Sequence, residues 1–175
     1  PRHIGFMMSE SPGNPVRMTV RALVVDPATN SPVVILAKPD ENAYLPIWIG
    51  TPEATAIALA LEGVETARPL THDLMKSVID ALGADIERVD VTSLDEGTFY
   101  ADLVIESDGE QLTISSRPSD AIALATRTGS PVFATRDLLD EAGVEIHDDT
   151  EEEEIERFRE FLDDVTAEDF FEQGP

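Results

Sequence analysis

Residues 86–116 read IERVDVTSLDEGTFYADLVIESDGEQLTISS, and apolar side chains alternate with polar ones along most of this stretch. Two short sequences interrupt the alternation, Asp-Glu-Gly at 95–97 and Ser-Asp-Gly at 107–109, and both are typical of tight turns between antiparallel strands. Alternation indicates a strand with one face in a core. The stretch therefore predicts three consecutive antiparallel strands, over 86–94, 98–106 and 111–116.

The chain before this stretch also begins with strand signals. Val16–Val25 alternates and is rich in valine, Val33–Ala37 is a short apolar run, and Tyr44–Ile49 follows a turn sequence. We expect three more strands here. Pro46 has no N–H to donate to a neighbouring strand, so its strand should lie at an edge of the sheet or contain an irregularity.

Four segments carry helix signals instead, each with a hydroxyl residue before the helix and a glycine after it. The expected N-caps are Thr51, Thr71, Ser119 and Thr135, and the expected helix ends are Gly63, Gly83, Gly129 and Gly143. In the second helix, Leu74, Val78 and Leu82 recur at helical spacing, so we expect them to form its buried side. The third helix is apolar all round from Ile122 to Ala125, which predicts deep burial.

Runs of strands that helices interrupt irregularly favour an α+β fold over a doubly wound α/β fold. We predict an α+β domain with a mixed, largely antiparallel β-sheet packed with several short helices. The sequence has neither a glycine-rich dinucleotide-binding fingerprint nor a Walker-type phosphate loop.

Three regions are expected along the chain. Residues 1–15 form a loose run containing serine, proline and glycine and are treated as a flexible leader. Residues 16–147 form the folded domain. Residues 148–175 are acidic, with apolar residues at helical spacing, and predict an amphipathic helical tail.

The formal net charge is −24, from 36 acidic and 12 basic residues, and 17 of the acidic residues follow Arg136. A field of this sign repels polyanions, which argues against tight nucleic-acid binding through a broad basic face. It leaves room for a small site where a metal ion or a few arginines meet a phosphate. The chain has no cysteine, so disulfides, thiolate metal sites and a cysteine nucleophile are excluded.

No apolar run approaches the roughly 20 residues that cross a membrane. No charged head followed by an apolar stretch marks a secretory signal peptide. We therefore expect a soluble, cytoplasmic protein with no membrane partner.

A local repeat indicates where chemistry would lie. Residues 68–73 and 117–120 share one plan, in which an arginine and a proline lead into a hydroxyl residue and then a carboxylate at a helix start. A guanidinium can hold phosphate oxygens in a bidentate way. Carboxylate oxygens are the ligands that hard divalent cations prefer. An imidazole such as that of His72 is a plausible proton carrier near neutral pH.

A purely structural interpretation fits the same residues. Acidic residues in first helical turns, here Glu53, Asp73 and Asp120, are what helix stability alone would favour. The two arginines would then simply pair with these acids. His72 would be an inert residue in an exposed first turn. Trp48, with Tyr44, would lie in the core or at an interface.

Five blocks of the sequence carry a family resemblance. They are LPIWIG at 45–50, EA at 53–54, RPLTHDL at 68–74, GTFYA at 97–101 and RPSDA at 117–121. In this order they resemble the bifunctional nuclease (BFN) domain family, over roughly residues 16–143. The acidic tail resembles the extension on many bacterial members.

The resemblance implies a compact α+β domain, a homodimer, and an activity that cuts both DNA and RNA. Combined with the chemistry of the motif positions, it predicts a metal-assisted nuclease that binds nucleic acid weakly. The predicted catalytic residues are Glu53, His72, Asp73 and Asp120, and the predicted substrate-binding residues are Arg68, Thr71, Arg117 and Ser119. A divalent ion, Mg or Mn, would be held by Glu53, Asp73 and Asp120 and would activate a water.

Two other functions fit the sequence. The protein could be a non-enzymatic interaction or regulatory module, in which the motif residues only brace helix starts. It could also hydrolyse small phosphorylated metabolites, because such a substrate needs the anion site but no nucleic-acid groove.

Overall fold

The turn sequences at 95–97 and 107–109 close two β-hairpins with two-residue loops. Glu96 and Gly97 have φ of 46° and 75°, and Asp108 and Gly109 have φ of 55° and 81°. Two successive residues with positive φ are what a type I′ turn requires. The predicted antiparallel run of β4 (Ala84–Asp95), β5 (Thr98–Ser107) and β6 (Glu110–Ser116) is thereby confirmed.

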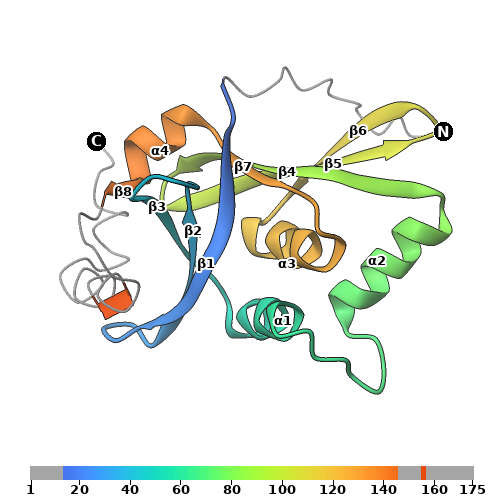
Figure 1. The fold of residues 1–175 in the computed structure, drawn as a ribbon, viewed down its shortest axis with the longest axis horizontal. Coiled ribbons are helices and arrows are strands. Elements are labelled where there is room, and N and C mark those ends of the chain that lie inside the picture. Colours follow the sequence, from blue (N-terminus) through green and yellow to red (C-terminus); the bar gives the residue numbers. More distant parts are fainter. Residues whose placement is uncertain (1–13, 146–154, 157–175) are drawn as a thin grey trace.

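These strands form one end of an eight-stranded sheet in the computed structural model, which describes residues 14–145 and 155–156 (Figure 1). The strand order is β6-β5-β4-β7-β1-β2-β3-β8, and of the paired neighbours only β4 and β7 run parallel. The strands are β1 (Val16–Asp26), β2 (Ser31–Ala37), β3 (Ala43–Trp48), β4 (Ala84–Asp95), β5 (Thr98–Ser107), β6 (Glu110–Ser116), β7 (Val132–Ala134) and β8 (Val144–Glu145). The sheet is therefore mixed and largely antiparallel, as predicted.

Pro46 lies in β3 where its missing N–H costs the ladder little. It faces Ile35 of β2 on one side. On the other side, among the described residues, β8 pairs only with Ala43 and Tyr44. The strand is an edge at Pro46, as the sequence predicts.

Within residues 14–145 four helices complete the fold: α1 (Thr51–Leu61), α2 (Thr71–Ala81), α3 (Pro118–Thr128) and α4 (Arg136–Ala142). Helix α3 packs on β4 and β5 and contacts both α1 and α2, whereas α4 packs on β3 and β4 (Figure 1). The predicted burial of α3 is confirmed, since Ala121–Ala125 are at most 2% exposed. This arrangement makes the fold an α+β fold.

The prediction for the buried side of α2 is wrong. Leu74, Val78 and Leu82 are 57%, 49% and 76% exposed, and His72 is the buried residue of this helix. Residues two positions apart on a helix point about 200° apart, so a helix that buries His72 turns Leu74 outward. Ile79, seven positions after His72, is the apolar residue of α2 that packs on the core.

Three of the four predicted N-caps are also off by one or two positions. The N-cap residues are Gly50, Leu70 and Arg117 instead of Thr51, Thr71 and Ser119. In α3, Pro118 takes the first helical position, where its fixed φ suits the helix, so the helix begins before Ser119. The fourth prediction is confirmed: the Thr135 hydroxyl accepts the Leu138 N–H at 3.3 Å.

Most of the predicted leader and tail lie outside the described residues. Within the tail, Ile155 and Glu156 are helical, and Ile155 packs on the smaller apolar cluster around Val33 and Ile35. No helix in the described ranges is long and apolar enough to cross a membrane.

Candidate functional site

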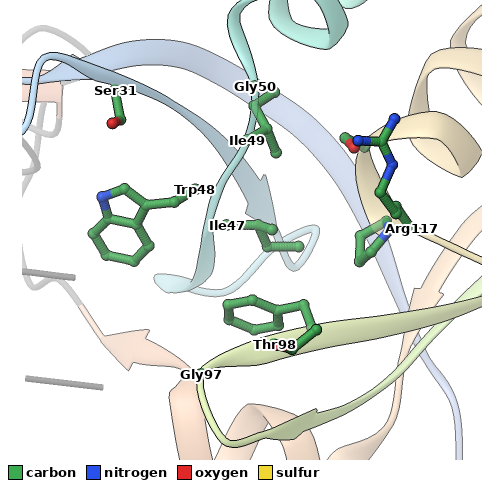
Figure 2. A pocket seen from close by; sticks show the side chains of 11 residues that line it. Ser31, Ile47, Trp48, Ile49, Gly50, Gly97, Thr98 and Arg117 are labelled. Carbon is green, nitrogen blue, oxygen red and sulfur yellow. The ribbon is translucent and has the colours of Figure 1, made fainter. Parts of the chain in front are cut away.

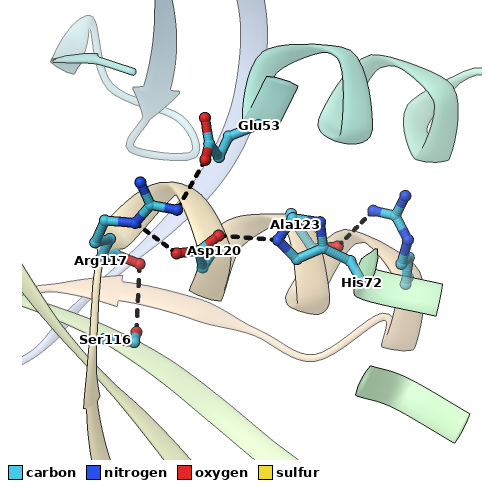
Figure 3. A network of polar contacts seen from close by, with 7 residues as sticks. Glu53, His72, Ser116, Arg117, Asp120 and Ala123 are labelled. Atoms are coloured by element: carbon cyan, nitrogen blue, oxygen red, sulfur yellow. Dashed lines mark hydrogen bonds and ion pairs between the residues drawn. The ribbon is translucent and has the colours of Figure 1, made fainter. Parts of the chain in front are cut away.

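The first turns of three helices meet on one side of the sheet (Figure 3). Glu53 comes from α1, His72 from α2, and Asp120 from α3, while Arg117 is the residue before α3. Glu53 and Arg117 contact each other although they are 64 positions apart in the sequence, and Asp120 contacts His72 across 48 positions. Asp120 also contacts Arg117, three positions before it. The fold therefore brings together parts of three sequence blocks.

Arg117 joins two of the three helix starts. Its Nε donates to Asp120 Oδ2 at 2.7 Å, and its Nη2 donates to Glu53 Oε1 at 2.7 Å (Figure 3). The side chain is nevertheless 65% exposed. The hydrogen bonds to Asp120 and Glu53 raise the pKa of Arg117, so the guanidinium is a fixed cation at the surface.

His72 extends this network into the protein. Its Nε2 lies 3.0 Å from Asp120 Oδ1 (Figure 3). The expectation of an exposed histidine is wrong, because the residue is only 6% exposed between α2 and α3. Burial raises the pKa of Asp120, but the hydrogen bonds from Arg117 and His72 outweigh it and leave the pKa below its usual value. Asp120 is thus an ionised acceptor, and the His72 nitrogen that faces it carries a proton.

Gly50 leaves steric room for the Glu53 carboxylate. The backbone there has φ −73° and ψ 152°, a conformation that any residue adopts. A Cβ at this position would lie 2.2 Å from Glu53 Oε2. The absence of a side chain at position 50 therefore leaves room for the Glu53 carboxylate in its present place, and a Cβ there would displace that carboxylate.

Asp73 belongs to a different contact. Its Oδ1 accepts from Arg127 Nε at 2.5 Å, and its Oδ2 accepts the Leu70 N–H at 2.9 Å. Arg127 is in the last turn of α3 and also donates to the carbonyl of Ala123 at 2.9 Å. The hydrogen bond from Arg127, with that from Leu70, lowers the pKa of Asp73. Oδ1 thus ties the start of α2 to the end of α3, while Oδ2 caps the first turn of α2 itself.

The remaining predicted site residues differ in exposure and in their distance from the network. Arg68 and Thr71 are exposed at the start of α2, and Arg68 makes no side-chain ion pair within residues 14–145 and 155–156. Ser119 is only 6% exposed and lies next to Arg117. The two arginines of the sequence repeat therefore differ, because Arg117 joins the network and Arg68 does not.

A pocket of about 360 Å³ opens beside Arg117 (Figure 2). It lies between the start of α3, the end of β3 and the loop that begins β5. Its lining residues are Ser31, Ile47, Trp48, Ile49, Gly50, Gly97, Thr98, Phe99, Arg117, Pro118 and Ser119. All five sequence blocks that carry the family resemblance contribute to the pocket or to the network at its rim.

The bifunctional nuclease domain matches residues 34–147 of the chain. Uncharacterized proteins from two strains of Mycobacterium tuberculosis are 45% identical over 154 residues, which cover 83% of this chain and 92% of theirs. The chain belongs to the bifunctional nuclease domain family. The family resemblance seen in the sequence is thereby confirmed.

More distant members of the bifunctional nuclease family are plant proteins. Bifunctional nuclease 2 of Arabidopsis thaliana is 26% identical over 124 residues, or 69% of this chain and 38% of the plant protein. Bifunctional nuclease 1 of the same plant is 25% identical over 149 residues, or 81% of this chain and 46% of that protein. The matched region spans less than half of each plant relative.

The predicted metal ligands of this family member do not form one cluster. Among the described residues there is no group of three or more histidine or acidic side chains arranged to hold a metal ion. Glu53 and Asp120 both contact the Arg117 guanidinium, while Asp73 contacts Arg127. The donor set as it stands does not fit a divalent ion.

Two residues of this site have no role in the sequence-based prediction. Arg127 lies near the end of a helix, where a basic residue is favourable without any partner, so its contact with Asp73 had no signal. Gly50 enters the sequence analysis only as the last residue of the LPIWIG block at 45–50. A signal for Gly50 existed in its spacing from Glu53, because the third residue of a helix can fold its side chain back toward the N-cap.

Proposed function

We propose that this protein hydrolyses phosphodiester bonds of DNA and RNA at the network of Glu53, His72, Arg117 and Asp120. The family supports a nuclease function. The single observation that carries the choice of site is the exposed Arg117 guanidinium, which two carboxylates hold at the rim of a pocket.

Arg117 binds and stabilises the phosphate in this proposal. Its third nitrogen, Nη1, makes no hydrogen bond to the described residues and can donate to a phosphate oxygen. When water attacks phosphorus, a P–O bond forms, the bond to the leaving sugar oxygen breaks, and charge accumulates on the remaining phosphate oxygens. A fixed cation at that position lowers the barrier because it interacts more strongly with the transition state than with the substrate.

Glu53, Asp120 and His72 act through Arg117. The two carboxylates fix the orientation of the guanidinium, and the Nε2–H of His72 fixes Asp120. The burial of His72 favours this positioning role over direct protonation of a leaving group. A metal ion would supply an activated water, but the carboxylates as they are arranged do not fit a metal ion.

Cleavage of single-stranded DNA and RNA by purified protein tests the proposal. We expect Arg117→Ala to lower kcat/KM by about 100-fold or more, the usual effect of losing one fixed donor to a transition state. Arg136→Ala is the matched control, since Arg136 is exposed on α4 and lies outside the network. Arg68→Ala, chelation with EDTA, and added Mg or Mn test the predicted phosphate ligand and metal dependence in the same assay.

The two ion pairs of Arg117 also support the non-enzymatic alternative, in which they only brace helix starts. In that case the folded Arg117→Ala protein would show the same cleavage as the wild type, from contaminating nuclease. Hydrolysis of nucleotides without any cleavage of polymer would instead support an enzyme of small phosphorylated metabolites.

We also propose that two copies associate through the outer face of α2. This face carries the exposed Leu74, Val78 and Leu82, which recur one helical turn apart. In an antiparallel pair of α2 helices centred on Val78, Leu74 of each copy lies opposite Leu82 of the other, so the exposed apolar side chains cover one another. The chain is strongly negative overall, so electrostatic repulsion opposes association of two copies through their other surfaces.

A further inference from the structure

The pocket beside Arg117 differs from a simple anion site. Among the residues that line it, Arg117 alone is charged, and most of the others are apolar, glycine or hydroxyl residues. Its volume of about 360 Å³ lies at the small end of the range for pockets that bind small molecules. Such a lining suits one ligand with an apolar, planar part and one negative group.

Ser119 provides a second polar group at the same end of the pocket. The residue is only 6% exposed, and it lines the pocket. No buried side-chain oxygen or nitrogen of the described residues lacks a hydrogen-bond partner, so the Ser119 hydroxyl, which bonds to no described residue, is accessible to solvent. A ligand in the pocket can bond to this hydroxyl while it also contacts Arg117.

Aromatic side chains line the rest of the pocket. Figure 2 shows Trp48 and Arg117 on opposite sides of it, with Ile47 between them. The Trp48 indole N–H donates to Asp26 Oδ2 at 2.9 Å, which fixes the ring. Phe99 also lines the pocket, from the start of β5. The polar and aromatic ends are thus separated, as are the phosphate and base of a nucleotide.

We propose that this pocket binds one unpaired nucleotide unit, with the phosphate at Arg117 and Ser119 and the base against Phe99 and Trp48. The inference rests on the proposed phosphodiester hydrolysis and names its substrate class as single-stranded nucleic acid. A base inside a duplex is stacked and paired, so it enters such a pocket only after it has been unstacked. The net charge of −24 supports this reading, because a duplex would bring many phosphates to an acidic surface.

Trp48 is the one tryptophan of the chain, so its fluorescence reports on the pocket directly. Uridine 5′-monophosphate, uridine and inorganic phosphate are titrated separately into the full-length protein. We expect saturable quenching by the nucleotide at concentrations well below those of the two fragments. Equal affinity for phosphate alone would overturn the proposal, because it would show an anion site without a base site.

Two variants test the two ends of the pocket. Phe99→Leu keeps most of the side-chain volume and should weaken nucleotide binding roughly 5- to 150-fold, the range for a lost base–aromatic stack. Ser119→Ala, which leaves the fold intact, should weaken binding of the nucleotide but not of uridine. Unchanged nucleotide affinity in both folded variants would contradict the proposal.

Cleavage assays separate this inference from the proposed function. A single-stranded RNA should be cut at least tenfold faster than the same sequence closed into a hairpin stem. Equal cleavage of both forms would overturn the inference and leave the nuclease function standing. Tight nucleotide binding without any cleavage would support the pocket and contradict the proposed function.

Discussion

The Glu53 carboxylate fits beside the start of α1 because residue 50 has no side chain. We predict that Gly50→Ala displaces this carboxylate and breaks its ion pair with Arg117. The pair is exposed, so the free energy of unfolding should fall by no more than about 1 kcal/mol. Misorientation of the guanidinium should lower kcat/KM roughly 10- to 100-fold.

Steady-state kinetics and thermal unfolding measure the two effects separately. Glu53→Gln serves as the comparison, because both substitutions act on one contact and their effects should not add in the double variant. Wild-type kcat/KM in Gly50→Ala would show that the orientation of Arg117 by Glu53 has no catalytic role.

A second prediction at this scale concerns Asp102, which faces Asp90 across the β4–β5 pair. Burial, and then the charge of Asp90, raise the pKa of Asp102. The folded protein therefore binds this proton more tightly than the unfolded chain, and stability falls as pH rises through the folded-state pKa. Asp102→Asn removes that cost, so it should stabilise the protein at neutral pH.

We expect the Tm of Asp102→Asn to exceed that of the wild type by about 2–4 °C at pH 7, which corresponds to about 1 kcal/mol in a domain of this size. The difference should shrink on acidification and disappear only below about pH 3.9, where the carboxyl becomes protonated in the unfolded chain as well. Asp140→Asn, an exposed site on α4, should change Tm at neither pH. A Tm difference that grows as the pH is lowered would contradict this explanation, which predicts that the difference shrinks.

At the level of elements, the contact between Asp73 and Arg127 holds α2 against α3. The Arg127 side chain is 8% exposed, so removal of its partner leaves a buried charge unpaired. We predict that Asp73→Ala lowers the free energy of unfolding by about 2–3 kcal/mol, as measured by urea denaturation. The depressed pKa of Asp73 means that its stabilising effect is present at neutral pH and is lost as pH falls through that value.

Glu41→Ala is the control for Asp73→Ala, because the Lys38–Glu41 pair lies on an exposed turn and should contribute at most about 1 kcal/mol. Equal destabilisation by the two substitutions would show that Asp73 does not clamp the helices. A folded Asp73→Ala protein without cleavage activity would instead return Asp73 to the catalytic role predicted from the sequence.

The outer face of α2 leads to a prediction about assembly. The wild type should elute with twice the 19.1 kDa mass of one chain in chromatography with light scattering. Val78→Glu should give the monomer, because it places two carboxylates at the centre of the proposed contact. Ile114→Glu is the control, since Ile114 is also 49% exposed but lies on the edge strand β6, outside α2.

A charge pair tests the arrangement of the proposed α2 pair. Leu74→Lys should weaken the dimer, and the added substitution Leu82→Glu should restore part of it, because positions 74 and 82 lie opposite each other in a pair centred on Val78. A monomeric wild type, or a dimer that survives Val78→Glu, would exclude α2 as the contact.

The elements differ in how far sequence could predict them. The strands from residue 84 onward follow from alternation and turn residues, both of which are local properties. The buried side of α2 does not follow, because apolar spacing cannot distinguish a core face from an exposed one. Tertiary packing determines which side of α2 is buried, because it places His72 and Ile79 against α3 and the sheet.

For the whole molecule, the sequence blocks located the site but not its internal contacts. Glu53, His72, Arg117 and Asp120 are joined, although Glu53 lies outside the repeat of helix starts. Asp73 and Arg68 follow the same local pattern, yet one is tied to Arg127 and the other is exposed. Which of two similar motifs enters a site depends on the crossing of α2 and α3, and no local signal encodes it.

The charge of the whole molecule makes a last prediction, about salt. Nucleases with broad basic faces lose affinity steeply with salt, because each neutralised phosphate of a single strand contributes about −0.7 to the slope of log affinity against log salt. Here Arg117 is the one cation that lines the pocket. Salt also screens the repulsion between the substrate and a chain of net charge −24, which acts in the opposite direction.

We therefore expect kcat/KM on single-stranded RNA to change with a slope between about −0.7 and slightly above zero from about 50 to 200 mM salt. Arg117→Ala should shift the slope by about +0.7, while Arg136→Ala should leave it unchanged. A wild-type slope steeper than about −3 would require at least four phosphate contacts. Such a slope would mean that the substrate contacts several cations on a basic surface. This would contradict a one-nucleotide site, because Arg117 is the one cation among the residues that line the pocket.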